Sequence, residues 1–148
     1  MIDARDVELR NLTYGLVGRL GRIPSAAEAA VSARVGRDEL VATWRRLHDA
    51  HALVFDRRTD ELLMAHPFSA VPTAYRVRVR GRWWYANCGW DAFGICAALH
   101  GDGTIETACP DGGEAIRIEV ADERPDGESL LFHCLVPAAR WYDDVVFT

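Results

Sequence analysis

The stretch that decides the fold covers residues 75–101 and reads YRVRVRGRWWYANCGWDAFGICAALHG. It opens with apolar and basic side chains in alternation, which is typical of a half-buried strand. Gly81 then turns the chain into the aromatic run RWWYA, so a second strand is expected beside the first. Residues 90–99 follow a helical pattern that stops at Gly101. Cys88 therefore lies where a strand turns into a helix.

Cys88 has the surroundings of a reactive thiol at this junction. The first turn of a helix presents backbone N–H groups without helical partners and the positive end of the helix dipole, and both favour the thiolate. Asp91 comes three residues later, one turn along the same face. Its carboxylate is expected close enough to exchange a proton with the sulfur or with a molecule bound there. Alternatively, Asp91 only stabilises the helix dipole.

Beyond this stretch the sequence keeps the pattern of a β-sheet. GTIETA (103–108) and EAIRIEV (114–120) are predicted as two strands joined by the turn-rich CPDGGE, and ESLLFHCLV (128–136) as a last strand. Residues 67–72 form a short linker with a proline at each end. Residues 67–148 are thus expected to form a small mixed β-sheet domain with one prominent helix.

The first half of the chain has the pattern of a helical module. Apolar side chains at helical spacing predict a helix over residues 4–20, ended by Gly21. Ser25 is a candidate N-cap for a second, short helix, because Glu28 follows it at the spacing of a capping box. A third helix is expected to open at Gly36.

After the third helix, ALVFD (52–56) and ELLMA (61–65) flank a polar turn and predict a two-stranded hairpin. Three helices followed by a hairpin is the winged-helix order, so residues 1–66 are predicted to be a winged-helix-like module in an α+β protein. A DNA-binding module would contact phosphates through exposed arginines, namely Arg37, Arg45, Arg46, Arg57 and Arg58. Alternatively, these arginines are solvated surface of a purely structural module.

The charge of the chain argues against nucleic acid as a general partner. Residues 1–66 hold ten arginines and ten acidic residues, whereas residues 67–148 hold seven arginines and twelve acidic residues, which gives the net charge of −5. No apolar run reaches the about 18 residues of a membrane span, and the N-terminus lacks a signal-peptide pattern. A cytoplasmic protein without membrane contact is expected. The oligomeric state is not indicated.

The four cysteines are expected to be free thiols, metal ligands or catalysts, because disulfides are rare in a reducing compartment. None of them forms a C-x-x-C pair, which argues against a structural zinc site. Cys96 is predicted to be a small buried side chain on the helix, and Cys109, before a proline, to have a structural role. Cys134, in the last predicted strand, is a candidate functional thiol.

The residues around Cys88 resemble the core of the alkylmercury lyase family. There a strand pair leads into Tyr-Ala-x-Cys-x-x-Asp, which here is YANCGWD, residues 85–91. The likeness continues through ALHG and reaches Cys109 at the family's separation of 21 residues, and the family also has a winged-helix-like N-terminal module. The resemblance implies cleavage of a carbon–mercury bond, with Cys88 as the mercury-binding thiolate, Asp91 as the proton relay and Cys109 as a structural cysteine. Mercury would be substrate and product, and no cofactor is expected.

One part of the family pattern departs. The family's second catalytic cysteine lies near the C-terminus, after an LVP-like segment and an Asp-Val pair. CLVPAARWYDDVVFT follows that pattern up to Thr148, where the chain stops about where this cysteine is expected. An alternative alignment puts Cys134 on the motif, where it would join Cys88 and Asp91 as a mercury ligand.

Three functions therefore stay open. The first is an alkylmercury-lyase-like enzyme whose second thiol is absent or replaced by Cys134, Cys96 or Cys109. The second is a metal- or small-molecule-binding sensor with a winged-helix module. The third is an enzyme on the same scaffold that acts on another thiol-reactive substrate.

Overall fold

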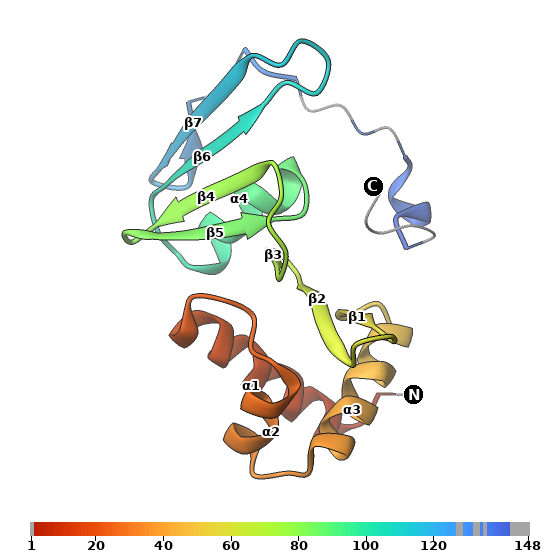
Figure 1. Cartoon of the computed structure of the whole chain (residues 1–148). Coiled ribbons are helices and arrows are strands. Elements are labelled where there is room, and N and C mark those ends of the chain that lie inside the picture. The colour runs from red at the N-terminus through yellow and green to blue at the C-terminus, as the bar shows by residue number, and fades with distance from the viewer. Residues whose placement is uncertain (1, 127–128, 132–133, 135, 143–148) are drawn as a thin grey trace. The chain divides into compact units, whose positions relative to one another are not determined.

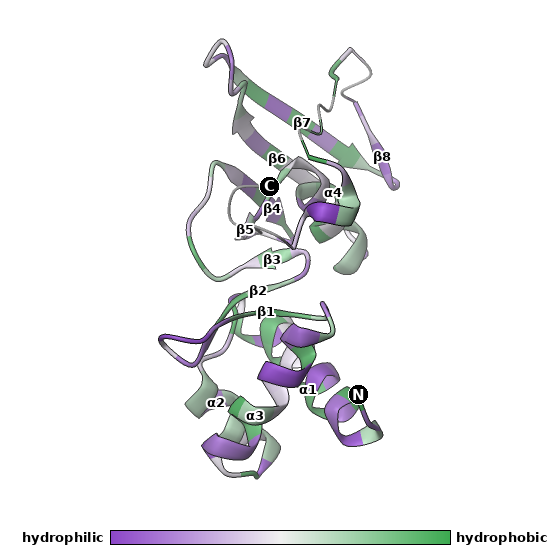
Figure 2. Cartoon of the chain, turned by 90° about the vertical axis from the view of Figure 1, so that its right-hand side faces the viewer, coloured by the Kyte–Doolittle hydropathy of each residue, from purple (hydrophilic) through white to green (hydrophobic). Residues whose placement is uncertain are grey.

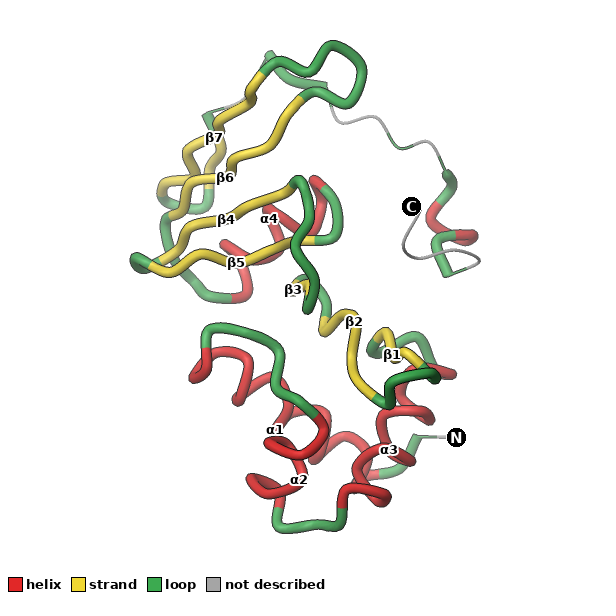
Figure 3. Tube along the Cα trace, in the orientation of Figure 1, coloured by secondary structure: helices red, strands yellow, loops and turns green. Residues whose placement is uncertain are grey.

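The computed structural model describes residues 2–126, 129–131, 134 and 136–142. The chain forms two compact units, residues 1–71 and residues 72–148. Figure 3 shows the helices α1–α3 in the first unit, whereas strands dominate the second. Within the described residues, every helix is too short or too polar to cross a lipid bilayer.

The first unit contains three helices followed by three short strands. In chain order these are α1 (Ala4–Leu20), α2 (Ala26–Ala33), α3 (Arg37–Asp49), β1 (Val54–Asp56), β2 (Glu61–Ala65) and β3 (Phe68–Ser69). The three helices and the β1–β2 hairpin lie where the sequence predicts them. Strand β3, which pairs antiparallel with β2, lies in the segment expected to be a linker.

Local hydrogen bonds explain where the helices begin and end. Ser25 accepts a hydrogen bond from the Glu28 N–H at 3.3 Å, and the Glu28 carboxylate accepts one from the Ser25 N–H at 2.9 Å, so the predicted capping box is confirmed. Asp3 and Asp6 form a second capping box at the start of α1. At the other end of α1, Gly21 adopts the left-handed φ of 74° that a helix C-cap favours.

The core of the first unit is mainly apolar, and a chain of hydrogen bonds runs inside it. Trp44 is fully buried, and its indole N–H donates to the Thr13 hydroxyl at 3.2 Å. Thr13 in turn donates to the Leu9 carbonyl at 2.8 Å. Because each buried polar group has a partner, the apolar packing carries no uncompensated polar cost.

The second unit is an antiparallel sheet with one helix. Its elements are β4 (Tyr75–Val79), β5 (Arg82–Ala86), α4 (Gly89–Ala98), β6 (Gly103–Ala108), β7 (Ala115–Ala121), β8 (Arg124–Pro125) and a 3₁₀ turn (Ala138–Arg140). The strands lie in the order β5-β4-β6-β7-β8 (Figures 1 and 2). The α+β class is confirmed, but the sheet expected to be mixed is antiparallel in every pairing described for this unit.

Side chains alternate between the two faces of this sheet. Figure 2 shows hydrophobic and hydrophilic residues in turn along β7. Val77 of β4, Ala86 of β5 and Ile105 of β6 are at most 2 % exposed, and α4 packs against these three strands. The helix thus covers the apolar face and starts where β5 ends.

The last strand predicted from the sequence, over residues 128–136, is wrong for the residues described there: 129–131, 134 and 136 lie outside any strand. The edge of β7 is instead paired with β8, directly after a two-residue turn. Asp122 and Glu123 form that turn with positive φ values of 49° and 62°, as a tight hairpin requires. The apolar run in residues 128–136 indicated a strand only from local sequence. The turn at Asp122 and Glu123 instead determines that β8 pairs with β7.

Candidate active site

The start of helix α4 is built by the end of strand β5. Cys88 is the N-cap of α4, with extended backbone angles, and its carbonyl accepts the first helical hydrogen bond from Ala92 at 3.0 Å. Just before it, the Thr73 hydroxyl donates a short hydrogen bond to the Ala86 carbonyl, which ties the segment before β4 to the end of β5. The predicted position of Cys88 at the strand-to-helix junction is therefore confirmed.

Asp91 lies in the first turn of α4, close enough to Cys88 to affect its ionisation. The half-buried Cys88 sulfur forms no side-chain capping hydrogen bond, yet the N–H groups of Asp91 and Trp90 lie near enough to stabilise negative charge on it. The carboxylate of Asp91 does the opposite, because its charge and its hydrogen bond both favour the protonated thiol.

Burial decides the balance at this thiol. Desolvation is the largest effect and, together with the Asp91 carboxylate, raises the pKa of Cys88 above the ordinary thiol value despite the N–H groups. The N–H groups that the sequence predicts at the helix N-terminus do favour the thiolate, but burial and the Asp91 carboxylate outweigh them. The structure favours a thiol that still holds its proton beside a carboxylate.

Tyr75 belongs to the same site and was not indicated by the sequence. It pairs with Ala86 across β4 and β5, so its half-buried side chain lies on the face that α4 covers. Burial and, second, the negative charge of Cys88 raise the pKa of Tyr75. Thr107 follows Glu106, the partner of Arg76 on β4, and its buried hydroxyl has no hydrogen-bond partner among the described residues.

The aromatic residues that flank Cys88 in the sequence do not form one buried wall. Trp84 is 5 % exposed and belongs to the core, but Trp83, Tyr85 and Trp90 are 40 %, 37 % and 65 % exposed. Trp83 carries the guanidinium of Arg76 over its ring at 4.3 Å. An apolar surface for an organic group is therefore available at Trp90, in the first turn of α4.

With this geometry described, comparison with known proteins identifies the family. A protein-family model for alkylmercury lyase (MerB) matches residues 68–148, more than half of the chain. The chain belongs to the alkylmercury lyase family. A crystal structure of the mercury-bound form of MerB2 is similar to it with a TM-score of 0.67 at 18 % sequence identity. The match covers 84 % of this chain and 59 % of that chain, and it shows a shared fold. A search of curated proteins finds no match.

The distances from Cys88 to the other cysteines decide which thiol could share a metal ion with it. Cys96 lies on the same helix, eight residues further on. At a rise of about 1.5 Å per residue, the two are about 12 Å apart along the axis. Two sulfurs that share one metal ion, at bonds of about 2.3 Å, cannot lie more than about 4.6 Å apart. Cys96 is therefore too far from Cys88 for the two sulfurs to share one metal ion.

Cys109 leaves the sheet at the same end as Cys88, but on the other side of β4. Cys88 comes two residues after Ala86, the partner of Tyr75, and Cys109 comes three residues after Glu106, the partner of the neighbouring Arg76. Neighbouring strands are about 4.8 Å apart, and β4 lies between β5 and β6. The ends of β5 and β6, from which the two cysteines leave the sheet, are therefore about 10 Å apart in total. By this estimate Cys109 is a nearer candidate than Cys96 for a second sulfur beside Cys88.

Cys134 is exposed and lies outside any helix or strand. Within the described part of the chain, no three His, Cys, Asp or Glu side chains lie together as a metal ion would require. All four cysteines are free thiols. The assignment of Cys134 as a mercury ligand beside Cys88 and Asp91 stays a prediction.

The arginines that a DNA-binding module would use already face acidic side chains. Each lies within 4.0 Å of a carboxylate oxygen, and the pairs are Arg37–Asp60, Arg45–Asp60, Arg46–Asp6, Arg57–Asp49 and Arg58–Asp56. Phosphate would have to compete with these carboxylates. The arrangement gives no support to nucleic acid as a partner of the first unit.

Proposed function

We propose that the protein cleaves the carbon–mercury bond of an organomercury compound, with Cys88 binding mercury and Asp91 transferring the proton. The observation that supports this most is the placement of the two residues at the start of α4. There a protonated thiol and a carboxylate interact within one helical turn. Membership of the alkylmercury lyase family supports the same chemistry.

The proposed reaction has two steps. First, the Cys88 sulfur bonds to mercury while its proton passes to the Asp91 carboxylate and the anion bound to mercury leaves. The raised pKa of Cys88 means that this proton is present at neutral pH. Second, the carbon–mercury bond breaks, and Asp91 returns the proton to the carbon, which leaves as a hydrocarbon. Mercury(II) remains on the Cys88 sulfur.

The mercury ion then requires a second soft ligand, because thiolates are its preferred partners. Cys96 is too far along the helix for this role. A thiol from solution, Cys109 after a local rearrangement, or Cys134 would supply the second sulfur. The proposal rests on Cys88 and Asp91 and does not depend on which of these thiols takes part.

The test is anaerobic incubation of the reduced protein with phenylmercury acetate and a small thiol. Benzene release is followed by gas chromatography, and bound mercury by intact protein mass. We expect benzene release from the wild type, none above background from Cys88→Ser, and at least a tenfold loss in Asp91→Asn. Asp38→Asn is the matched control, because Asp38 also lies in the first turn of a helix.

A phenylmercury adduct on Cys88 that persists without benzene release would contradict the proposed cleavage. The protein would then be a binding protein for organomercury compounds. Benzene release that is unchanged in Cys88→Ser would refute the assigned sulfur. Equal losses in Asp91→Asn and Asp38→Asn would remove the proton-transfer role of Asp91.

A further inference from the structure

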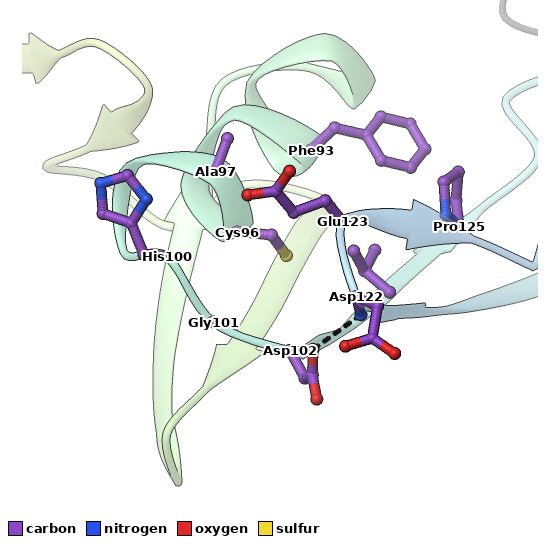
Figure 4. A pocket seen from close by; sticks show the side chains of 10 residues that line it. Phe93, Cys96, Ala97, His100, Gly101, Asp102, Asp122, Glu123 and Pro125 are labelled. Atoms are coloured by element: carbon purple, nitrogen blue, oxygen red, sulfur yellow. Dashed lines mark hydrogen bonds between the residues drawn. The ribbon is translucent and has the colours of Figure 1, made fainter.

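A hollow lies on the second unit, and its lining does not include Cys88. It has a volume of about 660 Å³ and lies between the C-terminal half of α4 and the β7–β8 turn (Figure 4). Phe93 and Cys96 line it from the helix, and Asp102, Asp122 and Glu123 line it from the loop after α4 and from the turn. Neither Cys88 nor Asp91 belongs to its lining.

Cys96 provides the sulfur of this cavity. Its side chain is only 4 % exposed, and its Sγ points from α4 toward the turn at Asp122 (Figure 4). Gly103 lies next to the sulfur, since an added Cβ there would stand 2.7 Å from Sγ. The Cys96 thiol is thus packed against Gly103 on one side and lines the cavity on another.

The rim of the cavity is negatively charged. Asp102 accepts a hydrogen bond from the Asp122 N–H at 3.0 Å, which joins the loop to the turn. Positive φ values at Asp122 and Glu123 bring two further carboxylates to the same rim. His100 is the one lining residue with a basic side chain, and no arginine is among the described lining residues. An apolar cavity with one sign of charge attracts small ions of the opposite sign.

The lining also suits the body of an organic ligand. Apolar groups contribute most of the exposed lining, and the ring of Phe93 lies at one side of the cavity (Figure 4). A phenyl ring attracts cations through its face. The thiol adds a soft atom that bonds to soft, electron-poor centres.

We propose that this cavity is a second binding site, for a small organic cation with a thiol-reactive centre that bonds to Cys96. With an organomercury cation, the S–H bond is replaced by an S–Hg bond. The proton goes to a rim carboxylate or to water, and the ligand on mercury leaves; no oxidant or reductant is required. Burial raises the pKa of Cys96, so bonding is coupled to loss of the thiol proton. The site is independent of Cys88 and stands whether or not Cys88 cleaves organomercury compounds.

The test uses two thiol reagents that differ in charge. They are 2-(trimethylammonium)ethyl methanethiosulfonate and 2-sulfonatoethyl methanethiosulfonate, which both form a mixed disulfide and release methanesulfinate. The full chain is labelled at low salt, and modification of Cys96 is followed by peptide mass spectrometry. We expect the cationic reagent to modify Cys96 about tenfold faster or more, and added salt to reduce that preference.

The variant Asp122→Asn/Glu123→Gln removes two rim charges and keeps the shape of the side chains. In it the preference at Cys96 should fall several-fold, while the rate ratio at Cys109, which does not line the cavity, stays unchanged. If the variant does not fold, the salt dependence in the wild type decides alone. Equal rates for the two reagents, a faster anionic reagent or no modification of Cys96 would each overturn the proposal.

The mercury form of the ligand is tested in the Cys88→Ser variant. Incubation with methylmercury chloride should leave one methylmercury group on the peptide that contains Cys96. Because Cys88 is absent from this variant, the result is independent of the proposed cleavage reaction. A protein that carries methylmercury on Cys109 and Cys134 but none on Cys96 would contradict the site.

Discussion

The Asp91 carboxylate opposes ionisation of the Cys88 thiol across the first turn of the helix that Cys88 caps. Thiolate formation and catalytic activity of a cysteine usually increase together, but at Cys88 the two are expected to respond differently to Asp91. A catalytic cysteine is commonly activated by groups that lower its pKa. Here the neighbouring acid raises it, which suits the proposed role of Asp91 in collecting the thiol proton and delivering it to carbon.

The first prediction follows from this opposition. Asp91→Asn removes a charge that raises the pKa of Cys88, so the thiolate should form at lower pH. We expect iodoacetamide to alkylate Cys88 roughly threefold faster or more at pH 7, although the proposed carbon–mercury cleavage falls at least tenfold. The pH dependence of alkylation measures this, with peptide mass spectrometry assigning the cysteine. A slower or unchanged rate would show that the carboxylate does not act on the sulfur.

The second prediction concerns Tyr75. Because the Cys88 thiolate raises the pKa of this phenol, Cys88→Ser should lower it. The chain has four tyrosines, so a difference titration near 295 nm between wild type and variant can resolve the change of one. The matched control is Cys109→Ser, which should leave the tyrosine titration unchanged. Superimposable titration curves for Cys88→Ser and the wild type would separate Tyr75 from the site.

Local signals were sufficient to predict most of the fold. Helix α2 is an example, since Ser25 and Glu28 specify its start through hydrogen bonds within four residues. Strands β3 and β8 were not predicted, because each has two residues and no periodicity can be read from so short a segment. Both strands exist through pairing with a neighbour, which local sequence does not encode.

The candidate site shows the same division. Cys88 and Asp91 were predicted because both lie in one helical turn, where spacing in sequence gives spacing in space. Tyr75 was missed because its place depends on the pairing of β4 with β5, thirteen residues before Cys88. The direction of the pKa shift at Cys88 was also missed, since burial is a property of the packed sheet and helix.

The third prediction concerns the stability of the first unit. Asp6 is fully buried and accepts hydrogen bonds from the half-exposed Arg46, whose guanidinium lowers the pKa of Asp6. Asp6→Asn should reduce the free energy of unfolding by about 1–3 kcal/mol, with solvent near Arg46 limiting the loss. Urea unfolding at pH 7 measures this, and the exposed Glu8→Gln is the control.

The pH dependence of this effect has a definite sign. A carboxyl whose pKa is lowered by folding stabilises the folded state above its unfolded pKa of about 3.9 and loses that contribution as the pH falls through the folded value. The difference between wild type and Asp6→Asn should therefore shrink below about pH 4. A difference that stays constant down to pH 2 would mean that ionisation of Asp6 does not contribute.

The fourth prediction concerns DNA. Since the arginines of α3 and the hairpin face carboxylates, the chain should give no salt-dependent gel shift with random duplex DNA at 50 mM salt. Asp60→Asn frees Arg45 and weakens the hold on Arg37, so it is the variant in which weak binding should first emerge. A salt-dependent shift of the wild type would restore DNA as a partner of the first unit.

The fifth prediction uses the close packing behind Cys96. A methyl group at Gly103 would stand 2.7 Å from Cys96 Sγ and 2.9 Å from the Arg78 carbonyl oxygen. Gly103→Ala should therefore lower the free energy of unfolding by about 1–3 kcal/mol, because the backbone oxygen cannot move aside cheaply. Gly15→Ala is the control: its methyl group meets nothing within 4 Å in helix α1, so stability should stay equal or rise.

Cys96→Ala should rescue Gly103→Ala only in part, since it removes the sulfur contact and leaves the carbonyl contact. Full rescue would show that the sulfur alone limits the space at Gly103, and no rescue would show that Sγ does not press against this glycine.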